Sequence, residues 1–374
     1  MGNLKSADQI EKEEMATANE RLRARIDAVT KERDAARRDA AASLRHAEEV
    51  SRQFEILTEI DNIKPKPREW GKVRKSKGKY QATALTLMSD WHFDEVVNPN
   101  ELIGPNGEPL NAYSRDIARK RLKVYSEGLV TVSKELCSGF AWDGLIAMLD
   151  GDLVSGNIHE ELAETNDAVS VIETVETWID PIIEVIKFWA DEFGFVHIIG
   201  TVGNHGRRTR KPRAKGRVKD NFDWLLLRQV ARYFEKDQRV TWHVPETADA
   251  YFDVYGHTHA VTHGDQARGG SGISGLLTPL SLLDHRKRKR DQAMVDYLGS
   301  GRVYSHLWVG HWHTRMEMGA VTINGSGKGI DEFSFGGNFG FEVPKQSFAA
   351  VTPEHNVTIQ APIYCNAGRK VEGW

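Results

Sequence analysis

Residues 196–207 read VHIIGTVGNHGR, an apolar and largely β-branched run that stops at a glycine-asparagine-histidine turn. Such a short run, bounded by glycine, is typical of a buried strand. The turn places an amide, Asn204, beside an imidazole, His205, at the carboxyl end of that strand. Open α/β sheets bind their ligands at this edge. The stretch therefore predicts a layered α/β fold with its chemistry at strand ends, although the tripeptide alone also fits an ordinary turn.

Four other expected strands end in polar residues of the same kind. In chain order these residues are Asp90 and His92, Asp152, His263, and His311 and His313. Alternate side chains of an extended chain point to one side, so Asp-x-His and His-x-His each aim two ligands in one direction. Carboxylates, imidazoles and an amide, without thiolates, suit Mn²⁺, Fe or Zn²⁺ better than Ca²⁺ or Mg²⁺. The pattern predicts two divalent cations that clamp a phosphoryl group and generate hydroxide at neutral pH.

The order of the expected elements indicates α/β layering, because strands alternate with helices of ten residues or more. Strands are expected at residues 82–88, 142–149, 196–202, 240–244, 251–255, 260–262 and 303–309. Helices are expected at residues 114–137, 165–193, 222–234 and 284–298, with strands and loops after them. Ser114 is a suitable helix cap, and Pro181 predicts a break or kink.

The chain of 374 residues divides into three segments. Residues 1–60 lack proline, and a heptad frame that includes Leu22, Ile26 and Val29 predicts a helical segment that self-associates as a coiled coil. A single solvated helix is the alternative. Residues 61–80 combine proline with many lysines and arginines, which predicts a basic linker. Residues 81–374 form the expected globular domain.

The composition excludes several classes of protein. Cys137 and Cys365 are far apart and fit no metal or redox spacing, which favours a reducing compartment. No apolar run is long enough to span a membrane, and the first residues are too polar for a secretory signal. The expected location is the cytoplasm, with no membrane partner.

The motifs Asp-x-His, Gly-Asp, Gly-Asn-His, His-Gly and Gly-His-x-His follow one another in the order found in calcineurin-like metallophosphoesterases. The chain resembles that superfamily over residues 83–326. The wordings SDWH at 89–92, GDLVSGNIHEEL at 151–162, GNHGR at 203–207 and NGS at 324–326 more narrowly resemble a phage and prophage branch labelled DNA repair exonuclease or phosphoesterase. The resemblance implies a β-sandwich flanked by helices and, for a phage protein, the host cytoplasm.

The resemblance also implies a role for each motif residue. Asp90, His92 and His313 hold one cation, Asn204, His263 and His311 hold the other, and Asp152 bridges the two. Mn²⁺ is the expected metal, with Fe or Zn²⁺ as alternatives. His205 is not a ligand but the second catalytic residue beside Asp152: it stabilises the transition state and protonates the leaving oxygen. Metal-bound hydroxide attacks the phosphorus in line.

A second Gly-His-x-His, at residues 256–259, precedes the His263 motif. It lies too early to be the last ligand motif, so we expect a hairpin turn with solvent-facing histidines. Asp94, Asp150 and Asp265 are candidates for orienting the ligand imidazoles, although capping or surface roles explain them equally well.

Specificity is expected to come from the surroundings of the site. Arg207 and Arg208 follow His205 directly, and a basic run continues to Lys219; with the basic residues 286–290 it favours a polyanion such as DNA or RNA. Asn157 and His159 follow Asp152 and are further candidates for substrate contact. The sequence therefore predicts a metal-dependent phosphodiesterase, specifically a nuclease. A phosphomonoesterase acting on nucleotides or phosphoproteins, and a non-catalytic coiled-coil or nucleic-acid-binding protein, are the alternatives.

Overall fold

The computed structural model describes residues 80–267 and 275–366, together with residues 15, 23, 25–27, 29–31, 33, 34 and 37. The chain divides into two units, Met1–Ser76 and Lys77–Trp374. The scattered described residues of the first unit are helical. Most of the predicted coiled coil, and the basic linker as far as residue 79, lie outside the described residues, so self-association stays a prediction.

Six strands form the first sheet, in the order β11-β10-β1-β2-β3-β4. They are β1 (Tyr80–Met88), β2 (Phe140–Asp150), β3 (Val196–Thr201), β4 (Val240–His243), β10 (Lys345–Thr352) and β11 (Asn356–Tyr364). Strands β1 to β4 are parallel, whereas β10 runs antiparallel to both β1 and β11. The carboxyl ends of β1, β2 and β3 therefore lie next to one another at one edge of the sheet.

Five strands form the second sheet, in the order β5-β6-β7-β9-β8. They are β5 (Asp249–Val254), β6 (His257–Thr262), β7 (His306–Val309), β8 (Met316–Met318) and β9 (Val321–Ile323). Strands β6, β7 and β9 are parallel, and β5 and β8 pair antiparallel at the two edges. The ends of β6 and β7 are thus also adjacent.

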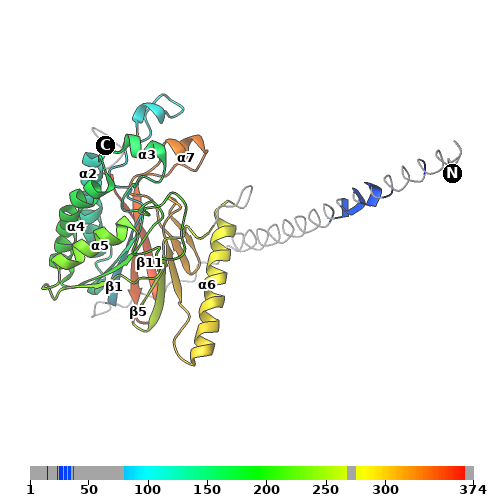
Figure 1. Cartoon of the computed structure of the whole chain (residues 1–374). Helices are drawn as coiled ribbons and strands as arrows, with labels where there is room; N and C mark the ends of the chain where they lie inside the picture. Colours follow the sequence, from blue (N-terminus) through cyan, green and yellow to red (C-terminus); the bar gives the residue numbers. More distant parts are fainter. Residues whose placement is uncertain are drawn as a thin grey trace, which may run out of the picture. The chain divides into compact units, whose positions relative to one another are not determined.

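Helices cover the outer face of each sheet, and Figure 1 shows α2, α4 and α5 on one side of the strands and α6 on the other. The helices are α2 (Arg115–Val130), α3 (Glu160–Thr165), α4 (Val171–Phe193), α5 (Phe222–Tyr233), α6 (Leu277–Leu298) and α7 (Glu332–Gly336). A 3₁₀ turn spans Pro99–Glu101, and a π-helical segment, Thr131–Leu136, continues α2. The predicted layered α/β fold, a β-sandwich flanked by helices, is confirmed.

The side chains of β1 explain why this strand is apolar without alternation. Ala84 and Met88 pack into the core beneath α2 and α4, while Leu85 and Leu87 pack between the two sheets. A strand covered on both faces needs apolar residues at successive positions. The layer between the sheets also contains Trp308 of β7, which joins the two halves of the sandwich.

The helix boundaries differ from the expectation at three points. Pro181 lies inside α4, which runs unbroken from Val171 to Phe193. The expected helix at 165–193 begins at Val171, where Ser170 caps α4 through its side chain, and a separate short helix, α3, precedes it and ends at Thr165. Helix α6 begins at Leu277, seven residues before the expected start.

The hairpin expected at residues 256–259 is present, but its histidines do not both face solvent. Tyr255 and Gly256 have positive φ and form the turn between β5 and β6. His259 is fully buried, stacks on Phe252 and accepts a hydrogen bond from Trp308. The expectation of two solvent-facing histidines was therefore wrong for His259, because β6 begins at His257 and turns this side chain into the core.

None of the described helices is both long enough and apolar enough to cross a bilayer.

Candidate metal centre

The predicted ligands lie in loops that directly follow five strands. Asp90 and His92 come after β1, Asp152 after β2, Asn204 after β3, His263 after β6, and His311 and His313 after β7. The first three loops belong to one sheet and the last two to the other. The structure brings these loops together into three overlapping groups of ligand atoms, each group within 4.8 Å.

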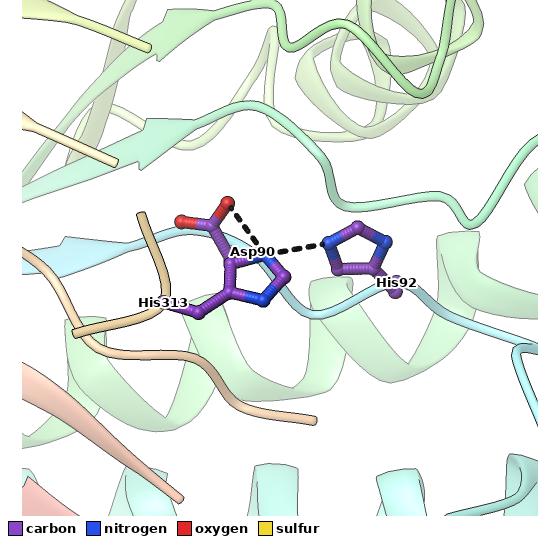
Figure 2. A group of neighbouring side chains, drawn as sticks. All are labelled: Asp90, His92 and His313. Atoms are coloured by element: carbon purple, nitrogen blue, oxygen red, sulfur yellow. Dashed lines mark hydrogen bonds and ion pairs between the residues drawn. The ribbon is translucent and has the colours of Figure 1, made fainter. Parts of the chain in front are cut away.

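The first group consists of Asp90, His92 and His313. Figure 2 shows one ring nitrogen of His313 directed at both of the other side chains. This Nε2 lies 3.1 Å from His92 Nε2 and 3.4 Å from Asp90 Oδ1. Two imidazole nitrogens and a carboxylate oxygen at this spacing offer the mixed donor set that suits a divalent transition metal.

The second group consists of Asp152, His263 and His311. His263 Nδ1 lies 2.7 Å from the backbone oxygen of Asp150, so this nitrogen carries a proton and donates it. The other nitrogen, Nε2, lies 3.0 Å from Asp152 Oδ2. A lone pair facing a carboxylate needs a cation or a proton between them. Without a metal a proton fills that role: burial opposes it, but Asp152 raises the pKa of His263 well above its usual value.

Asn204 supplies a further oxygen. Its side-chain Oδ1 is buried and has no hydrogen-bond partner among the residues that the structure describes. A buried acceptor without a donor costs free energy, and native structures rarely contain one without a reason. A cation coordinated by this amide oxygen would remove the cost, so Asn204 fits the role predicted for it.

Asp152 connects the second group to His92 of the first. It also belongs to the third group, with His92 and His205. One carboxylate oxygen, Oδ2, faces His263, and the other, Oδ1, accepts a hydrogen bond of 2.7 Å from the backbone N–H of His205. A carboxylate in contact with the ligands of both groups is placed to bridge two cations.

His205 is held with one ring nitrogen occupied and the other not. Its Nδ1 lies 2.9 Å from the backbone oxygen of Ser155, and its ring packs edge-on against His92 at 4.4 Å. Burial lowers the pKa of His205 to about 3, although the charge of Asp152 opposes this. The ring is therefore fixed beside the ligand groups, and no described residue forms a hydrogen bond with its Nε2.

The backbone of the ligand loops is strained. Asp90, His92, Asp152, His311 and His313 all have φ between 46° and 72°, the left-handed region that non-glycine residues rarely adopt. Five of the nine described non-glycine residues with positive φ are therefore predicted ligands. Such outliers persist where surrounding structure enforces them, and they cluster at functional sites.

Two glycines of the motifs are required by the packing of the loops. A Cβ at Gly203 would overlap the Asp152 carboxylate, and a Cβ at Gly151 would overlap the backbone of Gly203. The loops after β2 and β3 therefore touch backbone to backbone. This contact places Asp152 beside Asn204 and His205.

Asp223, in the first turn of α5, is a functional residue that the sequence analysis missed. Its carboxylate accepts hydrogen bonds of 3.0–3.2 Å from the backbone N–H groups of Asp152, Leu153, Val154 and Gly203. One buried side chain thus ties the β2 loop to the β3 loop. Burial and the charge of Asp152 raise its pKa to about 6. The only sequence signal is Asn221-x-Asp223, which resembles an ordinary helix cap.

Glu95 and Lys328 are two further residues that were missed. Glu95 Oε2 lies 3.3 Å from His92 Nδ1, and Glu95 Oε1 lies 2.6 Å from Lys328 Nζ. Of the acids proposed to orient imidazoles, Asp94 instead pairs with Arg115, and Asp265 with Arg217. Asp150 orients His263 through its backbone oxygen rather than its carboxylate.

The predicted substrate-binding residues lie around this centre. His159 is exposed, and its ring centroid is 5.8 Å from that of His205; Asn157 is exposed in the same loop. Arg207 donates to three backbone oxygens, those of Asn204, Thr209 and Arg210. The exposed Arg208 pairs with Asp220 at 2.7 Å. Arg207 thus fixes the loop after His205, and substrate binding by these four residues stays a prediction.

The basic run of α6 is less free than its sequence indicates. Lys287 pairs with Asp249 at 2.5 Å, Arg288 with Asp284 at 2.9 Å, and Arg290 with Asp249 at 3.0 Å. These three basic side chains therefore hold α6 against β5 or neutralise an acid within α6.

No protein-family model matches the chain, and no curated protein matches it in sequence. One similar solved structure is described as "Putative 5'-Nucleotidase from Staphylococcus aureus in complex with alpha-ketoglutarate". The two chains are 11% identical with a TM-score of 0.31, and the match covers 76% of this chain and 54% of the other. This chain thus spans about half the length of that protein, and a likeness of this size carries no argument about activity.

Proposed function

We propose that the chain is a dinuclear metal-dependent phosphodiesterase of the calcineurin-like type, and that it cleaves nucleic acid. The observation that carries the proposal is that Asp152 connects the second group of imidazole and carboxylate ligands to His92 of the first. The unpaired oxygen of Asn204 supports it independently. The resemblance to a phage branch of this superfamily supports the origin of the chain rather than its substrate.

Two divalent cations at these groups would supply hydroxide at neutral pH and neutralise charge on the phosphate. The chain's own residues do the rest. Ser155 and the edge of His92 fix the His205 ring. A phosphate anion bound at the centre would favour the protonated imidazole, whose Nε2–H could then donate to a phosphate oxygen. Asp223 holds the two loops that carry Asp152 and Asn204, which keeps the ligands in position before substrate arrives.

The basic loop after His205 supports a nucleic-acid substrate. Residues 207–219 contain eight arginines and lysines and no acid. Arg207 ties this loop to Asn204, so its positive charge lies beside the ligand groups. Such a loop attracts a polyanion more strongly than an isolated phosphomonoester.

A substrate panel tests the proposal. The purified chain with Mn²⁺ should hydrolyse bis-p-nitrophenyl phosphate faster than p-nitrophenyl phosphate, and should cleave single-stranded DNA, duplex DNA or RNA. Preference for the monoester would identify a phosphomonoesterase instead. Absence of all activity, with less than about one bound metal ion per chain by elemental analysis, would revive the non-catalytic alternative.

A further inference from the structure

A small cavity opens beside Asn204, between the loop after β3 and the basic loop that follows it. Its volume is about 30 Å³, room for about two water-sized groups. It is lined by Gly203, Asn204, Arg207, Thr209, Pro212, Arg213, Lys215, Gly216, Arg217, Asp220, Asn221 and Asp265. The space is partly open to solvent, so one or two oxygens of a larger polar group can enter it while the rest of the group stays outside.

The charges that line the cavity favour an anion. Four lining residues are basic and two are acidic. Both acids are already engaged, because Asp265 accepts two hydrogen bonds from Arg217 and Asp220 pairs with Arg208. Arg213 and Lys215 are exposed, and neither makes a hydrogen bond or ion pair with any described residue. The positive charges of these two side chains at the cavity wall are therefore not paired with a described acid.

The cavity is fixed to the metal centre rather than to a separate surface. Arg217 is held at 2.6 Å and 2.7 Å by Asp265, which follows His263 by two residues. Asn221 donates to the backbone oxygen of Gly203, and Arg207 donates to that of Asn204. An anion in the cavity would thus lie beside the ligand groups, at a position set by the same backbone.

We propose that this cavity is a second phosphate subsite, which binds the phosphate next to the scissile one through Arg213 and Lys215. The inference rests on the proposed phosphodiesterase activity and specifies the substrate as one with two neighbouring phosphates. An oligonucleotide and a nucleoside diphosphate share this chemistry. The structure favours the oligonucleotide, because the basic run extends beyond the cavity to Lys219.

The test compares two double variants of the same loop. Arg213→Ala/Lys215→Ala removes two charges that line the cavity, and Lys211→Ala/Lys219→Ala removes two that do not. Each is assayed with Mn²⁺ at fixed ionic strength on a trinucleotide with two phosphodiesters and on bis-p-nitrophenyl phosphate with one. For the trinucleotide, the cavity variant should lose about 10–100-fold in kcat/KM, since charge-assisted hydrogen bonds are lost. For the chromogenic diester it should match the parent.

The outcomes separate the subsite from its alternatives. An equal loss in both double variants would mean general attraction by the loop and would overturn the subsite, as would an unchanged cavity variant. A trinucleotide that is not cleaved by the parent, while the chromogenic diester is, would also overturn it. A cavity variant could instead keep its kcat/KM on the trinucleotide but be inhibited less than the parent by a nucleoside diphosphate. That result would overturn the oligonucleotide subsite and assign the cavity to nucleotides. If the parent cleaves no diester, the proposed function itself fails.

Discussion

His92 faces the ligand groups through one ring nitrogen and a buried acid through the other. Glu95 accepts from Lys328, and Lys328 also pairs with Asp331 at 2.5 Å. Burial alone would raise the pKa of Glu95, but Lys328 and His92 lower it to about 2, so the carboxylate stays ionised. A carboxylate behind a histidine ligand fixes the ring and makes it a better electron donor. Glu95 would therefore position His92 as a ligand.

Glu95→Gln keeps the shape of this side chain and removes its charge. We expect Mn²⁺ affinity to fall about 10–100-fold at the position that His92 serves, the usual effect of losing such a partner. Isothermal titration calorimetry should then resolve one weakened and one unchanged binding event. Glu101→Gln, an exposed acid of the 3₁₀ turn, is the control. Two unchanged binding events in Glu95→Gln would show that the contact is only structural.

His205→Ala should separate chemistry from metal binding. His205 belongs neither to the ligand group that contains His313 nor to the one that contains His311. The variant should therefore bind the same number of Mn²⁺ ions as the parent. Its kcat on bis-p-nitrophenyl phosphate should fall about 10²–10⁴-fold, as expected for loss of a general acid. Loss of metal in this variant would make His205 a ligand.

The matched controls are Asp152→Ala, which should lose metal, and His257→Ala, which should retain activity. His257 lies at the start of β6 and contacts the backbone oxygen of Pro353. Loss of metal in His257→Ala but not in His311→Ala would overturn the assignment of the Gly-His-x-His motif.

At the scale of elements, α5 holds together two loops of the neighbouring sheet. Its first turn supplies Asp223, whose four backbone donors come from the ends of β2 and β3. An amide cannot replace this carboxylate, because its NH₂ group would face backbone N–H donors.

Asp223→Asn should therefore both destabilise the fold and loosen the centre. We expect the free energy of unfolding to fall by about 1–3 kcal/mol for the buried donors left unpaired, measured by urea denaturation, together with weaker Mn²⁺ binding. Asp220→Asn, three residues earlier and partly exposed, should change neither by a comparable amount. Normal stability with normal metal binding in Asp223→Asn would contradict this role.

The buried histidines of β6 and β7 make the stability of the metal-free protein sensitive to acid. Burial, with the neighbouring His306, lowers the pKa of His259 to about 3, and burial lowers that of His306 to about 4. Below about pH 6.5 these histidines bind protons in the unfolded chain but not in the folded chain. The stabilisation is therefore complete above pH 6.5 and is lost as the pH falls toward 4.

Each of these histidines should lower the free energy of unfolding by about 1.4 kcal/mol per pH unit in that window. Urea denaturation at pH 7, 6 and 5 measures the slope. The slope should decrease in His259→Gln and stay unchanged in His285→Gln, which alters an exposed residue of α6. An unchanged slope in His259→Gln would show that other groups cause the acid sensitivity.

The sequence predicted the elements and the ligand loops because these are local signals. An apolar run followed by Asp-x-His or Gly-Asn-His carries both the strand and the ligands in consecutive residues. Asp223, Glu95 and Lys328 could not be found in this way, because each reaches the centre only through tertiary contacts. His259 was misplaced since its burial depends on Trp308, a residue of another strand.

At the scale of the whole domain, the centre exists only when the two sheets pack together. Asp90, Asp152 and Asn204 come from one sheet, and His263, His311 and His313 from the other. Cations bound by this arrangement would not find it in the unfolded chain, so metal binding would add to the stability of the fold.

Mn²⁺ should therefore raise the melting temperature, and a chelator should lower it to the metal-free value. Binding at 100 times the dissociation constant contributes about 2.7 kcal/mol per site. Scanning calorimetry with and without EDTA measures the shift, which should be absent in Asp152→Ala. A melting temperature of the parent protein that does not change with Mn²⁺ would argue against a preformed centre.

The separation of the ligands along the chain has a consequence during protein synthesis. His92 and His313 are 221 residues apart, and Asp152 and His263 are 111 residues apart. A growing polypeptide that has passed β3 already contains Asp90, Asp152 and Asn204 but lacks every histidine of the second sheet. An unfinished chain on the ribosome thus cannot assemble the centre. Both ligand groups would be complete only after β7 and its loop have been made.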